Sequence, residues 1–339
     1  MQISVGKRRG LEAVSDHRGV IAALAIDQRS ALRKLFSAAM GLEASQVPRE
    51  ILEDYKEAVS RVLTPYASAI LLDPEFGLRA ATLRAKKTGL LLAYEQSGYD
   101  KSVPGRLPRV LDGWSARKLA ATGANGVKTL VYYSPFSTPK INRVKYDWVE
   151  RIGAECAAAD VPYFLELVPY HDEIDEQSRE FAILKPEIVT QGIQEFSRPQ
   201  YGVDVLKVGV PVNMTFVGEA VGPPADAVYT REQSKELFRR ADAAASKPFI
   251  YLSEGVSNEM FSETLELAAE AGANFSGVLC GRSTWKDGVP IFAEKGLSAL
   301  EDWLATAGVK NIQRVNSLLA FAKPWFRFFE STSDTAVPG

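Results

Sequence analysis

Eight short apolar runs recur along this chain of 339 residues, and longer segments with helical periodicity separate them. Gly, Pro or a charged residue bounds each run, and nearly every residue within it is apolar. This pattern is typical of strands that are buried on both faces of a parallel sheet. The runs cover residues 19–27, 67–75, 89–95, 126–133, 162–168, 203–211, 248–255 and 276–282.

The segments between the runs carry helix signals. Four examples are residues 48–63, 146–160, 230–246 and 257–272. Thr230 and Gln233 form the pattern of an N-terminal capping box, and Gly123 and Gly272 stand where a helix ends before the next run. Eight strand-then-helix units in series predict a (β/α)8 barrel, the TIM barrel of the α/β class.

The span from Asp27 to Arg282 matches the length of about 250 residues that is usual for such a barrel. A doubly wound open sheet is the alternative, because alternation alone does not prove that the sheet closes. No segment has the composition of a linker, so we expect a single domain over residues 1–339, with an N-terminal extension and a C-terminal helical and aromatic tail. We expect the aromatic residues of 321–330 to pack on the outside of the barrel; a contact in a homo-oligomer is the alternative.

Charge and cysteine content exclude several classes of protein. The 40 Lys and Arg residues nearly balance the 42 Asp and Glu residues, which argues against a basic face for nucleic acid or an anionic membrane. Cys156 and Cys280 cannot form a disulfide framework, and no secretory signal precedes them. The apolar runs are far shorter than the roughly 20 residues of a membrane span. We therefore expect a cytoplasmic protein with reduced thiols.

Metal chemistry is limited by the two histidines, His17 and His171, which both lie in polar segments typical of solvated loops. A catalytic zinc site usually needs three protein ligands and an open position. We therefore expect no metal and no other cofactor, although Mg²⁺ bound by carboxylates needs no histidine and stays an alternative.

In a (β/α)8 barrel, functional residues lie at the carboxyl ends of the strands. Lys207 shares strand parity with Val203 and Val205, so we expect it to project into the barrel. Burial there favours the neutral amine, a nucleophile towards carbonyl groups that can form a Schiff base. The alternative is a lysine that reaches the rim or pairs with a carboxylate for structural reasons.

Glu166 projects inward by the same parity, one strand before Lys207. Apolar surroundings would raise the pKa of its carboxyl and suit it to proton exchange near neutrality. A structural ion pair with Lys207 or Lys128 is the alternative.

Lys128 is a second candidate for an inward cation. It could lower the pKa of Lys207 by like-charge repulsion or bind a substrate oxyanion. The alternative is a solvated lysine near the start of its strand. Asp27 ends the first run, and its simplest role is a helix N-cap. Asp73 and Glu95 are similar acids at strand ends and rank lower as candidates.

The last two runs end in the segments LSEGVS and LCGRSTW. Loops at this position in many barrels bind a phosphate group with backbone N–H groups. Gly255 and Gly281 would allow close approach, Ser253 adds a hydroxyl, and Arg282 can form paired bonds to phosphate oxygens. Glu254 is the contrary signal, because a carboxylate repels phosphate unless its side chain turns away.

The runs ALAIDQR, LTPYASAILLDPEFG, GLLLAYEQSGYD, VPYFLELVPY, DVLKVGVPVN, IYLSEGVS and GVLCGRSTW resemble the tagatose-1,6-bisphosphate aldolase family in order and over nearly the whole chain. These are class I aldehyde-lyases with a (β/α)8 barrel. The resemblance implies a phosphorylated sugar as substrate, with Lys207 as the Schiff-base lysine and Glu166 as the acid/base.

The resemblance also implies further contacts with the substrate. Lys128, Asp27 and Gln28 would contact hydroxyls or the reacting centre, and Arg29 the distal anionic group. The phosphate of a dihydroxyacetone phosphate half would be bound by Ser253, Leu279, Gly281 and Arg282.

Two positions depart from the family pattern. Gly209 stands where an acidic residue is expected, and Glu254 where a small residue is usual. Both lie near the expected substrate, so sulfofructose phosphate, the substrate of a related aldolase group, is an alternative to tagatose bisphosphate. A barrel that senses sugar phosphates without catalysis is the alternative from another class, and a metal-assisted isomerase or aldolase is the third.

Overall fold

The computed structural model describes residues 2–218 and 227–329. Eight parallel strands form a closed barrel in the order β1 to β8, because β8 pairs with β1 in the register Ile21↔Gly277. This closure confirms the (β/α)8 barrel and excludes the doubly wound sheet. The strands are Ile21–Ala25 (β1), Ala69–Leu72 (β2), Gly89–Ala93 (β3), Gly126–Tyr133 (β4), Tyr163–Pro169 (β5), Val205–Val208 (β6), Phe249–Tyr251 (β7) and Gly277–Cys280 (β8).

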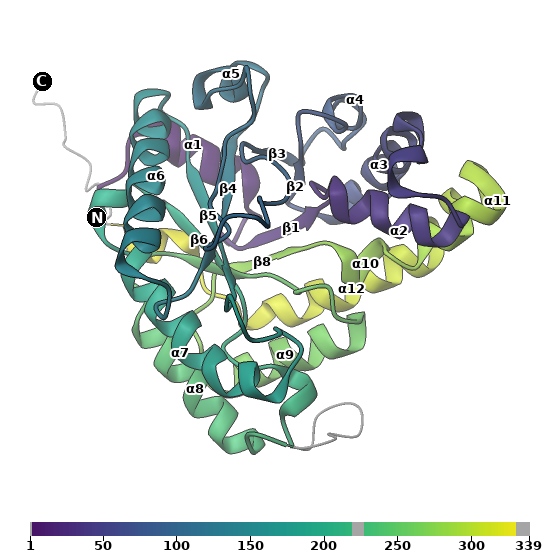
Figure 1. The fold of residues 1–339 in the computed structure, drawn as a ribbon. Coiled ribbons are helices and arrows are strands. Elements are labelled where there is room, and N and C mark those ends of the chain that lie inside the picture. Colours follow the sequence, from purple (N-terminus) through teal and green to yellow (C-terminus); the bar gives the residue numbers. More distant parts are fainter. Residues whose placement is uncertain (1, 219–226, 330–339) are drawn as a thin grey trace, which may run out of the picture.

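Helices surround these strands on all sides (Figure 1). They are Val5–Val14 (α1), Ser30–Met40 (α2), Arg49–Leu63 (α3), Leu78–Thr82 (α4), Ala116–Ala121 (α5), Pro139–Ala158 (α6), Arg179–Phe196 (α7), Arg231–Ala243 (α8), Asn258–Glu270 (α9), Arg282–Trp285 (α10), Gly288–Trp303 (α11) and Val309–Leu318 (α12). None of the described helices combines the length and apolar character needed to cross a membrane.

The helix signals in the sequence agree with the observed ends. The Thr230 side chain accepts a bond from the backbone N–H of Gln233, and the Gln233 side chain accepts one from the N–H of Thr230. Gly123 and Gly272 have positive φ angles and directly follow the C-cap residues of α5 and α9. Helix α6 begins at Pro139, earlier than the apolar periodicity indicated, because Thr138 caps it and proline suits the first helical position.

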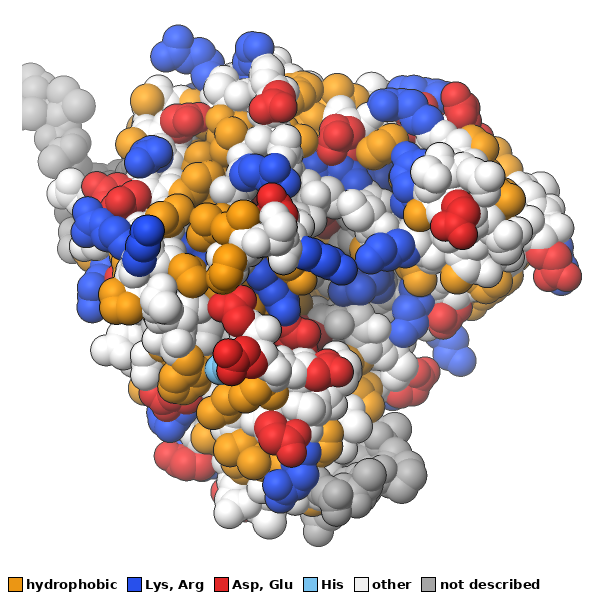
Figure 2. Space-filling model, viewed as in Figure 1, with side chains coloured by type: hydrophobic (Ala, Val, Ile, Leu, Met, Phe, Trp, Pro, Cys, Tyr) orange, Lys and Arg blue, Asp and Glu red, His pale blue; other side chains and the backbone are white. Residues whose placement is uncertain are grey.

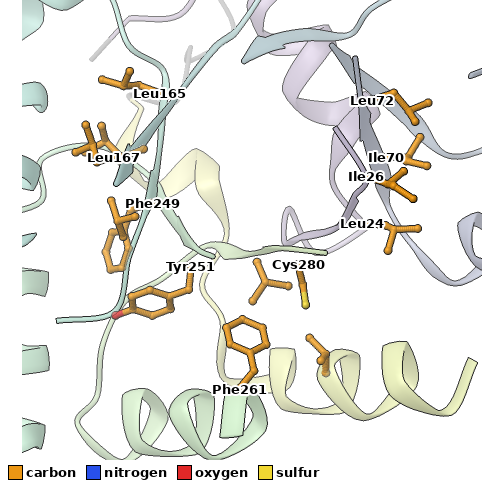
Figure 3. Close-up of a cluster of buried hydrophobic side chains, with 14 of the residues drawn as sticks. Leu24, Ile26, Ile70, Leu72, Leu165, Leu167, Phe249, Tyr251, Phe261 and Cys280 are labelled. Carbon is orange, nitrogen blue, oxygen red and sulfur yellow. The ribbon is translucent and has the colours of Figure 1, made fainter. Parts of the chain in front are cut away.

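The apolar residues of the strands pack on two sides of the barrel wall. Side chains such as Leu24, Leu72, Leu165 and Tyr251 point outward and pack against the helices, as Figure 3 shows. The alternate residues point inward and fill the barrel with a second cluster. This inner cluster contains Ile21, Ala23, Ala25, Ala69, Leu71, Leu91, Ala93, Phe164, Val205, Ile250 and Leu279, together with Leu11, Val14 and Trp325.

The aromatic tail differs from the expectation that it packs on the outside. Trp325 is only 2% exposed and belongs to the inner cluster with Leu11 and Val14 of α1. Its indole N–H donates to Ser15 Oγ at 3.2 Å, and its backbone N–H donates to the carbonyl of Gly19 at 2.9 Å. The tail therefore helps to close the amino-terminal end of the barrel; Glu330, its last predicted residue, lies outside the described residues.

Two adjacent aromatic residues test this closure. Trp325→Ala is expected to lower the free energy of unfolding by about 3–5 kcal/mol, because it leaves a cavity beneath the barrel. Phe326→Ala removes a ring that is 49% exposed and should cost much less. Denaturant titration of both variants measures the difference, and equal losses would contradict a closing role for Trp325.

Candidate active site

Four ionisable side chains enter the barrel at the carboxyl ends of their strands. Asp27, Glu95, Glu166 and Lys207 each stand two residues after a member of the inner cluster. Side chains two residues apart on a strand share a face, so a charged layer lies directly above the apolar filling. All four are at most 7% exposed, which confirms the inward direction expected for Lys207 and Glu166.

Lys128 is the centre of this layer. Its Nζ lies 2.9 Å from Asp27 Oδ2, 2.7 Å from Glu95 Oε1 and 2.7 Å from Glu166 Oε2. Burial opposes the charged form, but the three carboxylates outweigh burial and hold the pKa of Lys128 well above its ordinary value. Lys128 is therefore a permanent ammonium at neutral pH and is not a solvated lysine near the strand start.

Lys207 contacts the same carboxylate from the other side. The β5–β6 register places Glu166 opposite Lys207, and Lys207 Nζ lies 2.9 Å from Glu166 Oε2. Burial would raise the pKa of Glu166, but Lys128 and Lys207 outweigh it, so the pKa is lowered. The raised pKa predicted from the sequence is wrong, because the carboxylate lies between two ammonium groups and not in apolar surroundings.

Asp27 and Glu95 differ in their electrostatics although they share Lys128. Burial opposes ionisation of Asp27, yet Lys128 and then Lys207 lower its pKa. For Glu95, burial dominates and the pKa is raised despite Lys128 and Arg29. Asp27 does not cap the following helix, since Arg29 is the N-cap residue of α2 and no side chain bonds there.

Several buried polar atoms beside this layer have no hydrogen-bond partner among the described residues. They are Asp27 Oδ1, Gln28 Oε1, Arg29 Nε and Glu95 Oε2. A buried polar atom without a partner is costly, and such atoms are candidates for bonds to a ligand. Their chemistry suits the hydroxyl groups of a sugar, which both donate and accept hydrogen bonds.

Arg29 is already bound on two sides. Its Nη1 lies 2.8 Å from Glu75 Oε2, and its Nη2 donates to the backbone carbonyl of Glu95 at 2.7 Å. The side chain is 5% exposed. The guanidinium thus supports the β3 end of the charged layer, and its predicted contact with a distal anion stays a prediction.

The loops after β7 and β8 contact each other through Gly255 and Arg282. Gly255 has a φ of +80°, and a Cβ there would lie 2.8 Å from Arg282 Cζ, so the guanidinium packs where only glycine fits. A Cβ on Gly281 would lie 2.6 Å from the carbonyl oxygen of Ala25, and Ser253, two residues before Gly255, is buried. Leu279 directs its side chain into the inner cluster.

The structure also shows what the Glu254 carboxylate contacts, which the sequence marked as repulsive to a phosphate. Its Oε2 lies 2.5 Å from Lys185 Nζ on α7, so the carboxylate is paired with a lysine side chain. On the face drawn in Figure 2, Lys and Arg side chains gather around a central hollow with acidic side chains nearby.

Sequence reasoning ranked Glu95 low and did not single out Tyr132. Tyr132 stands four residues after Lys128 on β4 and is partly buried. Burial raises the pKa of its phenol, with Tyr99, Arg106 and Glu166 as charged or polar neighbours. Arg106 Cζ lies 5.2 Å from the Tyr132 ring centroid. Strand parity with Lys128 is the signal that could have found this residue.

Asp73, the other low-ranked acid, serves the fold: it pairs with buried Lys56 and accepts the backbone N–H groups of Glu75 and Phe76. Among the described residues, no group of three or more His, Cys, Asp and Glu side chains is placed to hold a metal ion.

The charged layer thus places a buried amine, Lys207, beside an ionised carboxylate, Glu166, at the carboxyl end of a closed barrel. The model of the DeoC/LacD family of aldolases matches residues 21–287. Tagatose 1,6-diphosphate aldolase 2 of Enterococcus faecalis is 50% identical, with 94% of this chain and 95% of that protein covered. Tagatose 1,6-diphosphate aldolase of Listeria monocytogenes is 46% identical, with 99% and 98% covered.

Solved structures agree in fold. Fructose-bisphosphate aldolase from Plasmodium falciparum superposes with a TM-score of 0.69 at 15% identity, covering 95% of this chain and 96% of that one. A Corynebacterium glutamicum protein reaches 0.57 at 15% identity, covering 92% and 90%. The chain belongs to the DeoC/LacD family of aldolases and is therefore a lyase.

The charged layer makes stability depend on pH. The pKa values of Asp27 and Glu166 are lowered from 3.8 and 4.5, so their stabilisation is present above those values and is lost as pH falls through the folded pKa. Lys128→Met removes most of this stabilisation, because Lys128 is the ammonium that both carboxylates contact. The difference in free energy of unfolding between wild type and this variant should be large near neutral pH and shrink below about pH 4.

The control is Lys118→Met, which removes an exposed ammonium on α5 and should change the free energy of unfolding little at any pH. Denaturant titrations at several pH values give both comparisons. A difference for Lys128→Met that does not change with pH would show that its carboxylate partners do not stabilise the fold in this way.

Proposed function

We propose that this chain is a class I aldolase that cleaves a phosphorylated ketohexose into dihydroxyacetone phosphate and an aldehyde through a Schiff base on Lys207. The first candidate substrate is D-tagatose 1,6-bisphosphate, whose aldehyde product is glyceraldehyde 3-phosphate, because relatives at 46–50% identity are named tagatose 1,6-diphosphate aldolases. The observation that carries the proposal is the buried Lys207 amine 2.9 Å from the ionised Glu166 carboxylate.

The reaction begins with the amine. Glu166 accepts a proton from the Lys207 ammonium, and the neutral amine attacks the C2 carbonyl carbon to give a carbinolamine. Loss of the C2 hydroxyl as water, with a proton from Glu166, leaves a protonated imine. The C3–C4 bond then breaks, and its electron pair flows into the imine to form a neutral enamine in place of a free carbanion.

Glu166 serves these steps because it is both ionised and close. Its lowered pKa keeps it deprotonated at neutral pH, which is the form that accepts a proton, and it can next accept the proton of the C4 hydroxyl as the aldehyde leaves. Lys128 stays protonated and holds Glu166, Asp27 and Glu95 in place. After cleavage, a proton returns to C3 of the enamine, and water hydrolyses the imine to release dihydroxyacetone phosphate.

The remaining side chains position the substrate. Ser253, Gly255, Gly281 and Arg282, with the backbone of Leu279, bind the phosphate of the dihydroxyacetone half. Asp27 and Gln28 offer their unpartnered oxygens to sugar hydroxyls, and Arg29 is the candidate contact for the distal anion. Fixing the C2 carbonyl against the amine supplies part of the rate enhancement.

Borohydride trapping tests the covalent step. Reduction in the presence of substrate should add the mass of the reduced ketose or triose adduct to the peptide that carries Lys207. Lys207→Met should abolish the adduct and lower turnover by at least about 10³-fold. Lys247→Met is the control, since that buried lysine precedes β7 at the opposite end of the barrel. No adduct, together with full activity of Lys207→Met, would refute the mechanism.

Glu166→Gln tests the proton transfers. The amide keeps the shape but cannot accept a proton, so kcat should fall by about 10²–10⁴-fold while KM changes much less. Because the pKa of Glu166 is lowered, its protonation should not limit wild-type activity between about pH 5 and 8. Coupled detection of triose phosphate measures both effects, and unchanged kcat would contradict the role of Glu166.

The same assay separates the substrates. A panel of tagatose bisphosphate, fructose bisphosphate and sulfofructose phosphate compares kcat/KM directly, and phosphate binding without turnover on any of them would instead favour the sensing barrel.

A further inference from the structure

Glu254 combines two unusual features in the loop after β7. Its φ is +50°, a left-handed conformation that a residue with a side chain rarely adopts. Its carboxylate also lies over Gly209, so that a Cβ built on Gly209 would overlap Glu254 Oε1. The side chain of Glu254 thus occupies the space that any side chain at position 209 would need.

Lys185 completes this arrangement. Its Nζ lies 2.5 Å from Glu254 Oε2 and donates to the backbone carbonyl of Val212 at 3.2 Å. The Lys185 side chain is 5% exposed and that of Glu254 is 24% exposed. One largely buried ammonium therefore joins three segments: helix α7, the chain after β6, and the loop after β7.

The residues on both sides of Glu254 are two of those proposed above to bind the phosphate. Ser253 is buried before it, and Gly255 packs against the Arg282 guanidinium after it. A bond that holds Glu254 by its side chain also holds the backbone on which Ser253 and Gly255 are carried. No hydrogen bond from the side chain of Ser253 or Arg282 to Glu254 is needed for this effect.

We propose that Glu254 is a positioning residue that sets the conformation of the phosphate-binding segment 253–255. Gly209 makes room for its carboxylate, and Lys185 neutralises a charge that would otherwise repel the phosphate. The inference rests on the proposed function, because it takes Ser253, Gly255 and Arg282 as the phosphate contacts. It also implies that Gly209 and Glu254 are coupled, so that a side chain added at position 209 displaces the carboxylate of Glu254.

The test measures phosphate affinity separately from turnover. Glu254→Ala should raise KM for the sugar phosphate, and the inhibition constant of inorganic phosphate, by about 10- to 100-fold, as expected for loss of a charged hydrogen bond. The value of kcat should change by less than about threefold, and trapping at Lys207 under saturation should persist. Glu259→Gln, an exposed carboxylate on α9, is the matched control.

Two further sets of variants test the charge of Glu254 and the space that its carboxylate occupies. Lys185→Met leaves the Glu254 carboxylate uncompensated and should weaken phosphate binding more than Glu254→Ala does, whereas Lys185→Met with Glu254→Gln should recover part of that loss. Gly209→Ala displaces the carboxylate and should resemble Glu254→Ala, and adding Gly209→Ala to Glu254→Ala should cost nothing more, because the overlapping atom is gone.

Unchanged phosphate affinity in Glu254→Ala, or additive losses in the Gly209→Ala double variant, would overturn the proposal. A fall in kcat together with the rise in KM, accompanied by a lower melting temperature, would also overturn the proposal, because it would show a general structural role for Glu254. The proposed function fails by a different result: wild type that neither cleaves a sugar phosphate nor forms the Lys207 adduct. In that case, calorimetric titration with inorganic phosphate still compares the phosphate affinity of wild type with that of Glu254→Ala.

Discussion

The bonds of the Lys128 ammonium to three buried carboxylates are the constraint on which the site depends. Burying a charge without a partner costs several kcal/mol, and three carboxylates at the end of one barrel would repel one another strongly. Lys128, Lys207 and Arg29 face Asp27, Glu95 and Glu166, so the layer is close to neutral as a whole. This balance allows Glu166 to stay ionised beside the Lys207 amine.

The apolar filling of the barrel makes the balance necessary. Inward side chains such as Phe164, Val205 and Leu279 exclude water from below, while α1 and Trp325 close the amino-terminal end. Electrostatic interactions are stronger in such surroundings than in water. The same packing that stabilises the fold therefore sharpens the interactions of the charged layer above it.

The sequence predicted most of the architecture, because its signals are local. Apolar runs bounded by Gly, Pro and charge located all eight strands, and parity placed Lys207 and Glu166 inside the barrel. Four aspects were not predictable in this way. These are the direction of the Glu166 pKa shift, the role of Glu95, the ion pairs of Arg29 and the burial of Trp325. Each depends on a neighbour that lies far away along the chain.

The turn of Glu254 towards Lys185 belongs to the same group. Its partner lies 69 residues away, and the space over Gly209 becomes visible only when β6 and β7 are side by side. From the sequence alone, a glutamate beside the segment proposed to bind phosphate could only be judged as repulsive. The three-dimensional arrangement neutralises it.

By itself, the amino-acid sequence determined which residues face inward and at which height in each strand, since the period of two is a property of the backbone. Which charges meet was decided by barrel closure and strand register. Asp27 and Lys128 are 101 residues apart, and no local rule connects them. A pKa follows from the nearest charges in space, so the chemistry of the site is a property of the folded barrel.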